Sequence, residues 1–180
     1  MNTDELWVFG YGSLLWAPGF DWCEKVLATL NDHSRLFCMR SIHYRGTKDN
    51  PGLVLALVAQ SGGRCQGLAY RVEPIKRKEA LSYLRKRELI SSAYLERQVS
   101  IKLVDGRRRM ATTFVMDRSH DQYCGNLPMA TQAQIISTAV GEKGPNAEYL
   151  QRTVERLATL GIEDGRLERL NRLVADRCKR

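Results

Sequence analysis

The order of the apolar segments constrains the fold more than any other feature of this sequence. Strand-like runs lie in the chain up to residue 116, at Leu6–Phe9, Ser34–Ile42, Leu53–Ala59, Cys65–Val72 and Val99–Met116. Helical spacing of apolar residues occurs in Pro74–Leu89, Thr131–Val140, Ala147–Leu160 and Leu167–Ala175. Such an order, with hairpin spacing between strands, predicts an α+β fold with a closed or strongly curved, mostly antiparallel sheet.

Several connections are also visible. Tyr44–Gly52 is rich in Gly, Pro, Asn and Asp and predicts a loop. Ser61-Gly62-Gly63 predicts a turn between two strands, and Asp105-Gly106 predicts the turn of a hairpin. Asp21–Leu30 fits either a short helix or an extended crossing. No repeat or linker interrupts the 180 residues, so we expect one domain over residues 1–180.

Charge and cysteine content argue against several classes of function, among them nucleic-acid binding and structural zinc binding. The net charge is +8, but the densest basic run, Arg107–Arg109, follows a hairpin turn and alternates between strand faces, which is typical of a solvated hairpin. The five cysteines include no CxxC pair, which argues against a disulfide framework or a zinc ribbon and favours free, mostly buried thiols. Without a membrane-length apolar run or signal peptide, we expect a cytoplasmic protein.

The first strand runs into a glycine-rich turn, Gly10-Tyr11-Gly12-Ser13. Glycines permit left-handed dihedrals and close approach of a ligand, and consecutive N–H groups in such a turn can form a nest for a carboxylate or phosphate. A tight bend after a core strand would account for the same residues. The turn matches neither dinucleotide nor mononucleotide fingerprints.

The segment from Leu84 to Tyr94 contains a candidate acid or base, Glu88, near the predicted end of a helix. A carboxylate in a cleft can serve as a general base when burial raises its pKa. A surface ion pair with Arg85 or Arg87 is the simpler interpretation. Glu79 lies nine residues earlier on the same predicted helix. Paired carboxylates are one interpretation, and a solvent-facing salt bridge of Glu79 is the simpler one.

The segment GEKGPNAEYL, residues 141–150, precedes and begins another predicted helix. Asn146 suits the N-cap position. Tyr149 in the first turn is either a buried tyrosine bonded to a backbone group or a hydroxyl at the edge of a site.

From about Trp7 to about Ile162, the chain resembles the ChaC-type γ-glutamylcyclotransferases. The resemblance rests on the order and spacing of seven segments: WVFGYGSLLW, FCMRSIHYRGT, PGLVLAL, GLAYRV, KRELISSAY, QYCGNLP and GPNAEYL. The resemblance implies a small mixed, mostly antiparallel β-barrel with flanking helices. It also implies that reduced glutathione is the substrate and is converted to 5-oxoproline and cysteinylglycine without cofactor or metal. Glutathione would then be the partner, with no nucleic acid or membrane, and we expect a monomer.

The same resemblance assigns roles to individual residues. It places the general base at Glu88 and the glutamyl-binding loop at Tyr11, Gly12, Ser13 and Leu14, and it puts Tyr149 at the substrate. The chain departs from the common family pattern at Tyr44, Leu53 and Ala93. These departures concern substrate features beyond the glutamyl group.

Three other functions are compatible with parts of the sequence. A cyclotransferase for other γ-glutamyl amines or peptides would keep the loop and the base. A thiol hydrolase or transferase would need Cys38 and His43, whose odd separation places them on opposite faces of a strand. A basic binding module without enzymatic activity would require a salt-sensitive interaction with nucleic acid.

Overall fold

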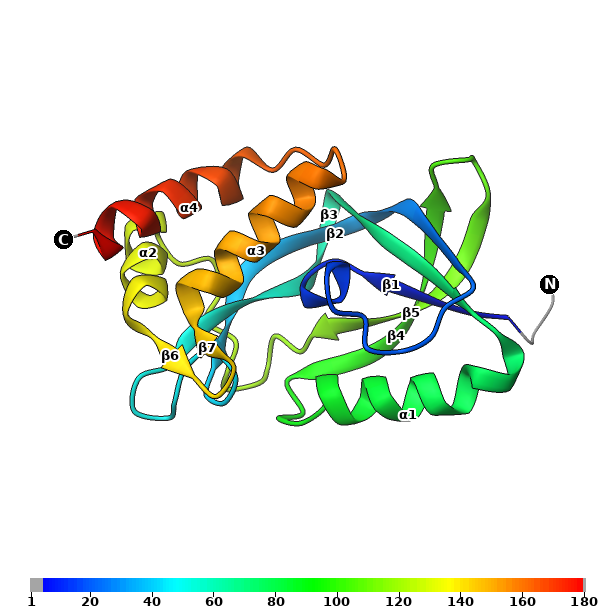
Figure 1. The fold of residues 1–180 in the computed structure, drawn as a ribbon, viewed down its shortest axis with the longest axis horizontal. Coiled ribbons are helices and arrows are strands. Elements are labelled where there is room, and N and C mark those ends of the chain that lie inside the picture. The colour runs from blue at the N-terminus through cyan, green and yellow to red at the C-terminus, as the bar shows by residue number, and fades with distance from the viewer. Residues whose placement is uncertain (1–4, 180) are drawn as a thin grey trace. The chain divides into compact units, whose positions relative to one another are not determined.

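The computed structural model describes residues 5–179 (Figure 1). The chain divides into two compact units, each of which is described by itself. The first unit contains the described residues up to Arg35 together with Leu57–His120, and the second contains Leu36–Ala56 together with the described residues from Asp121 onward. A single domain over residues 1–180 stays a prediction.

Five strands form a closed barrel in the order β1-β3-β2-β4-β5. Their bounds are β1 Leu6–Gly10, β2 Glu24–Ser41, β3 Gly52–Val72, β4 Tyr94–Leu103 and β5 Arg108–Met116. Antiparallel ladders join β1 to β3, β2 to β4 and β4 to β5, whereas β5 meets β1 and β3 in parallel. The predicted mixed, mostly antiparallel barrel and the Asp-Gly hairpin are therefore confirmed.

Strands β2 and β3 are longer than the sequence suggested. Asp21–Leu30 is not helical, because β2 already begins at Glu24. The predicted turn at residues 61–63 is wrong, since β3 continues through these residues. Asp32 (φ 56°) and Gly62 (φ 72°) both lie in the left-handed region, and the Gly62 N–H donates to Asp32 Oδ1 at 3.0 Å. These residues let two paired strands bend sharply without ending.

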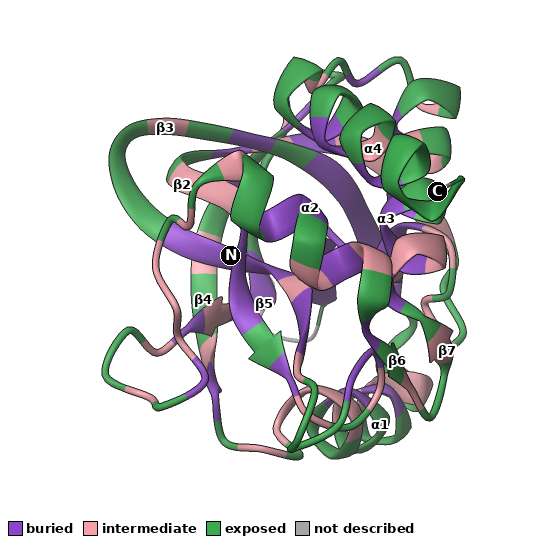
Figure 2. Ribbon diagram, turned by 90° about the vertical axis from the view of Figure 1, so that its left-hand side faces the viewer, coloured by how far each residue is buried: buried purple, intermediate pink, exposed green. Residues whose placement is uncertain are grey.

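The core of the first unit is built from alternating side chains of the barrel strands. Every residue of β1 is buried, as Figure 2 shows in purple for much of the barrel. The apolar cluster draws its larger side chains from four strands and the loop after β1: Trp7, Phe9, Tyr11, Leu30, Leu57, Ile101 and Leu103. Burial of this cluster fixes which face of each strand points inward, and hence the register of the barrel.

The helical elements of the first unit are η1 Ser13–Leu15, η2 Pro74–Lys76 and α1 Arg77–Glu88. Helix α1 buries only Ala80 and Leu84 fully, and its remaining residues are mainly charged. Arg85 forms two hydrogen bonds to Glu96 of β4, at 2.7 and 2.9 Å, so α1 lies alongside that strand (Figure 1). This contact is an ion pair whose Arg85 side chain is mostly exposed.

The second unit contains α2 Met129–Thr138, α3 Asn146–Thr159, α4 Gly165–Cys178 and the two-residue strands β6 Val140–Gly141 and β7 Gly144–Pro145. Buried and exposed residues alternate along α2, as expected for an amphipathic helix (Figure 2). Leu157 of α3 and Leu170 and Val174 of α4 are among the buried residues of the helices. The Asp164 side chain caps α4 by accepting the Leu167 N–H at 3.1 Å.

Asn146 does not have the predicted N-cap role. It is the first residue of α3, and Pro145 occupies the cap position without a side-chain hydrogen bond. The fully buried Asn146 amide instead pairs with the backbone of Leu53: Nδ2 donates to the carbonyl and Oδ1 accepts the N–H, both at 2.7 Å. The side chain therefore fastens the start of α3 to β3, which a local sequence pattern could not reveal.

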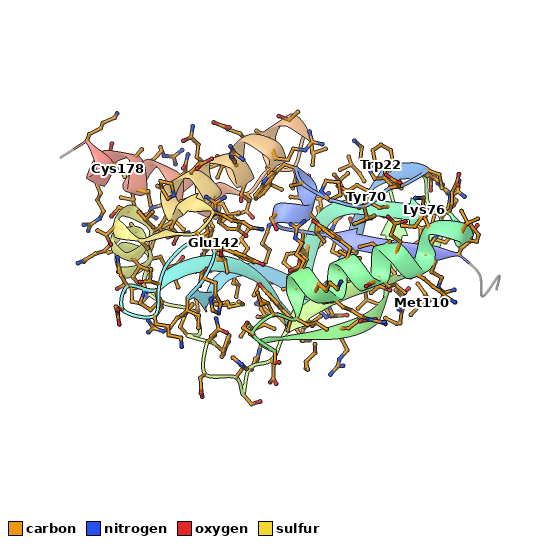
Figure 3. All side chains as sticks on the ribbon, turned by 60° about the horizontal axis from the view of Figure 1, so that its bottom comes forward. Trp22, Tyr70, Lys76, Met110, Glu142 and Cys178 are labelled. Atoms are coloured by element: carbon orange, nitrogen blue, oxygen red, sulfur yellow. The ribbon has the colours of Figure 1, made fainter. Side chains whose placement is uncertain are left out.

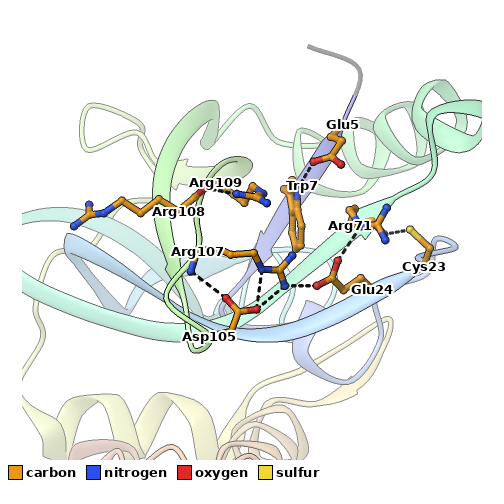
Figure 4. A network of polar contacts seen from close by, with 9 residues as sticks. All are labelled: Glu5, Trp7, Cys23, Glu24, Arg71, Asp105, Arg107, Arg108 and Arg109. Atoms are coloured by element: carbon orange, nitrogen blue, oxygen red, sulfur yellow. Dashed lines mark hydrogen bonds and ion pairs between the residues drawn. The ribbon is translucent and has the colours of Figure 1, made fainter. Parts of the chain in front are cut away.

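The basic hairpin carries a network of ion pairs (Figure 4). Arg107 contacts Glu24 and Asp105, and Glu24 also accepts a hydrogen bond from Arg71 at 2.9 Å. Arg107 also lies 5.8 Å from the ring centroid of Trp7. Arg107 first, and then Arg71, hold the pKa of the Glu24 carboxyl below its ordinary value.

The cysteines are free, but the expectation that most are buried is only partly right. Cys38 and Cys65 are buried, Cys124 is partly buried, and Cys23 and Cys178 are exposed. Cys178, at the end of α4, is labelled in Figure 3. Burial raises the pKa of the Cys124 thiol. Across residues 5–179, no helix combines the length and apolarity that crossing a membrane requires.

Candidate functional site

The loop after β1 consists of Tyr11, Gly12 and the short helix η1. A Cβ atom on Gly10 would lie 2.8 Å from Cβ of Leu14 and 3.4 Å from a ring carbon of Tyr70. Gly10 is thus required by the close approach of the protein's own loop. Neither Gly10 nor Gly12 uses the left-handed region that glycine permits, and Gly12 has φ −125° and ψ −124°.

Protein side chains hold the carbonyl groups of this loop. The Tyr70 hydroxyl donates to the Leu14 carbonyl at 2.7 Å, and Arg35 Nη1 donates to the Tyr11 carbonyl at 2.9 Å. In a trans peptide the N–H points away from the preceding C=O. The Gly12 N–H therefore points away from Arg35, and the first N–H groups of η1 have no acceptor within that helix. The arrangement is compatible with the predicted nest for an anion.

Glu88 is the last residue of α1, in the first unit, like the loop. Its side chain is 17% exposed and its Oε1 lies 3.0 Å from Arg87 Nε. The predicted ion pair with Arg87 is present, but the carboxylate is not on the open surface. Arg85, the other predicted partner, binds Glu96 instead.

Arg87 links the end of α1 to the loop. Nη2 donates to the Ser13 hydroxyl at 2.7 Å, while Nη1 donates to the Tyr83 hydroxyl at 3.2 Å and to the backbone carbonyls of residues 17 and 18. The Arg87 side chain is only 14% exposed. One guanidinium thus touches both a predicted binding residue, Ser13, and the predicted base, Glu88. The sequence showed Arg87 only as one of several cations around Glu88.

Glu79 has a different environment. Its side chain is 72% exposed and pairs with Lys76 at 3.0 Å, which confirms the expected solvent-facing salt bridge. Lys76, labelled in Figure 3, also lies 3.5 Å from Asp21. Glu79 and Tyr83 line a small hollow between α1 and the segment Gly19–Asp21.

Tyr149 lies in the second unit, on the first turn of α3. It is 7% exposed, its hydroxyl accepts the Leu55 N–H at 3.3 Å, and its ring packs edge-on against Phe37. The guanidinium of Arg45 lies 5.7 Å from the ring centroid and donates to the Pro145 carbonyl at 3.0 Å. The interpretation of Tyr149 as a buried tyrosine bonded to the backbone is confirmed, and contact with substrate stays a prediction.

Arg45 was not singled out by the sequence. Burial lowers the pKa of its guanidinium, an effect that the carboxylate of Glu148, 3.6 Å away, opposes. The alternative thiol site gains no support, because Cys38 is fully buried in β2 while His43 is exposed beyond the end of that strand. Within residues 5–179, no group of three or more His, Cys, Asp or Glu side chains is placed to hold a metal ion.

Comparison with known proteins identifies the family. The model of the ChaC-like protein family matches residues 6–177. The chain belongs to this family. It is 39% identical over 169 residues to the glutathione-specific γ-glutamylcyclotransferase of Escherichia coli, an alignment covering 94% of this chain and 72% of the relative. It is also 39% identical over 154 residues to γ-glutamylcyclotransferase 2-1 of Arabidopsis thaliana, covering 81% and 70% of the two chains.

Solved structures support the same fold. The crystal structure of the glutathione-specific γ-glutamylcyclotransferase from yeast superposes with a TM-score of 0.88 at 22% identity, covering 96% of each chain. A structure described as a γ-glutamyl cyclotransferase superposes with a TM-score of 0.60 at 16% identity. The barrel with flanking helices is therefore the fold of the γ-glutamylcyclotransferase group.

Proposed function

We propose that this ChaC-like protein is a glutathione-specific γ-glutamylcyclotransferase. The observation that carries the proposal is the mostly buried carboxylate of Glu88, which Arg87 links directly to Ser13 in the loop after β1. The names of relatives up to 39% identical over most of the chain support glutathione as the substrate. Both features belong to the first unit, so the proposal does not depend on the placement of the second.

The reaction needs a base and a leaving-group proton. The α-amino group of the glutamyl moiety attacks its own γ-carbonyl carbon, forming the ring C–N bond of 5-oxoproline. Because this amine is an ammonium at neutral pH, Glu88 first accepts a proton from it. As the bond to the cysteine nitrogen breaks, the protonated Glu88 returns a proton to that nitrogen, and cysteinylglycine leaves as an amine. The ring nitrogen gives up its second proton to water, and the released amine takes up a proton from water at neutral pH. Glu88 thus ends the cycle as a carboxylate.

The loop would fix the conformation of the substrate. The backbone N–H groups of Gly12, Ser13 and Leu14 would bind the glutamyl α-carboxylate. Tyr11 would hold the loop in place through its buried side chain, whose hydroxyl donates to the Phe114 carbonyl at 2.9 Å. Holding that carboxylate beside the base restricts the substrate to folded conformers in which amine and carbonyl meet, and such positioning accounts for much of an intramolecular rate.

Product analysis tests the proposal. The purified protein is incubated with reduced glutathione, and 5-oxoproline and cysteinylglycine are quantified by mass spectrometry. γ-Glutamylalanine and γ-glutamyl-ε-lysine, tested in parallel, separate this activity from that of a cyclotransferase for other γ-glutamyl compounds. We expect equal amounts of the two products from glutathione and little turnover of the other compounds. Absence of 5-oxoproline from glutathione would refute the proposal.

A further inference from the structure

The Arg87 side chain makes more directed contacts than an isolated ion pair would require. Its two terminal nitrogens donate to four oxygen atoms, two of them hydroxyls and two backbone carbonyls, and its Nε faces Glu88. The acceptors come from the loop after β1, the segment that follows it, and α1 itself. All lie in the first unit.

We propose that Arg87 is a positioning residue that sets the Glu88 carboxylate at a fixed place relative to Ser13. The inference rests on the proposed function and adds a residue to its machinery. A guanidinium is planar, and its N–H groups form a rigid fork. When Nη2 is bound to the Ser13 hydroxyl and Nη1 to Tyr83, the direction of Nε, and with it the place of Glu88, is determined.

The position of Glu88 makes such a contact necessary. Glu88 is the last residue of α1, where the helix dipole and the terminal carbonyl groups disfavour a negative charge. Three cations lie in the last turn, but Arg85 is engaged with Glu96. Arg87 holds the carboxylate at this unfavourable end and directs it toward the loop.

Arg85 provides a matched control. It lies two residues before Arg87 on the same helix and carries the same charge, and it also pairs with a glutamate, at 2.7 Å. Its side chain is 53% exposed and binds Glu96 of β4, whereas that of Arg87 binds Ser13 of the loop after β1. Arg85→Lys therefore makes the same chemical change on α1 at a place where no positioning of Glu88 is expected.

A double-mutant cycle tests the inference. The kcat for 5-oxoproline formation from glutathione is measured for wild type, Arg87→Lys, Glu88→Gln and the double variant, with melting temperatures alongside. Lysine keeps the charge but loses the fork, so we expect Arg87→Lys to lower kcat by about 10²-fold, the effect of a small misplacement of a reacting group. Because Arg87 acts through Glu88, the double variant should match Glu88→Gln, and Arg85→Lys should match wild type.

The outcomes separate this inference from the proposed function. A wild-type protein that makes no 5-oxoproline would refute the function itself. Suppose that wild type is active and Glu88→Gln is not. A normal kcat for Arg87→Lys would then overturn the positioning role. The role would also be overturned if Arg87→Lys lowered kcat by the same factor in the Glu88→Gln variant as in wild type. Should Arg87→Lys fail to fold, Arg87→Gln replaces it in the same cycle. Unfolding of both would overturn the inference, since Arg87 would then be a structural requirement of the fold.

Discussion

Asn146→Ala is expected to destabilise the second unit strongly. The Asn146 side chain is fully buried, and its amide satisfies both backbone groups of Leu53 at 2.7 Å. Alanine would leave a buried N–H and a buried C=O without these partners, at a cost of about 1–3 kcal/mol for each group. The free energy of unfolding should therefore fall by about 2–6 kcal/mol.

The assay is thermal unfolding followed by circular dichroism. For a chain of this length, 1 kcal/mol corresponds to about 2–4 °C, so Asn146→Ala should lower the Tm by at least about 4 °C. Asn50→Ala is the matched control, because the exposed Asn50 amide makes a long 3.4 Å contact with the Thr138 carbonyl. A change in Tm equal to that of the Asn50 control would refute the reasoning that Asn146 serves the backbone of Leu53.

Three further outcomes can be measured directly. Gly12→Val should abolish 5-oxoproline production by obstructing the backbone approach to the substrate carboxylate, and a folded variant with normal turnover, judged by circular dichroism, would contradict this. Iodoacetamide should label the exposed Cys23 and Cys178 first without loss of activity, and inactivation in step with labelling would support a thiol mechanism instead. Because Arg107 and Arg71 hold the folded-state pKa of Glu24 low, its stabilisation is present above the ordinary glutamate pKa of about 4.3 and lost as the pH falls through the lower folded-state value. Glu24→Gln should therefore flatten the acid limb of Tm against pH, and an unchanged limb would count against the network.

Local sequence patterns correctly predicted those helices and hairpins that depend on a single local preference. The hairpin at Asp105-Gly106 and the helices after residue 128 follow from turn chemistry and apolar spacing, and both are present. Ser61-Gly62-Gly63 does not form the predicted turn, because glycine allows a bend within a strand as readily as a turn. β3 continues through these residues, and the Gly62 N–H donates to Asp32. The pairing of β3 with β2, which is distant in the sequence, decides whether these residues bend or turn.

In the candidate site, too, the sequence revealed the residue types but not their long-range contacts. The residue types around Glu88 and the loop after β1 were visible in the sequence, but the partner of each side chain was not. Asn146 looked like a helix cap because Asn is favoured there, whereas its partner lies 93 residues away. Arg87 and Arg85 are equivalent in the sequence, and only the fold directs one to Ser13 and the other to Glu96.

The steady-state rate of 5-oxoproline formation by Glu88→Gln tests the central claim most directly. Glutamine keeps the size of the side chain but cannot accept the proton, so the rate should fall by about 10²–10⁴-fold. Glu96→Gln is the control, because Glu96 is also a partly buried carboxylate bound to an arginine of α1, and it should retain the wild-type rate. A folded Glu88→Gln protein within about threefold of wild type, far short of the loss expected for a general base, would contradict the account.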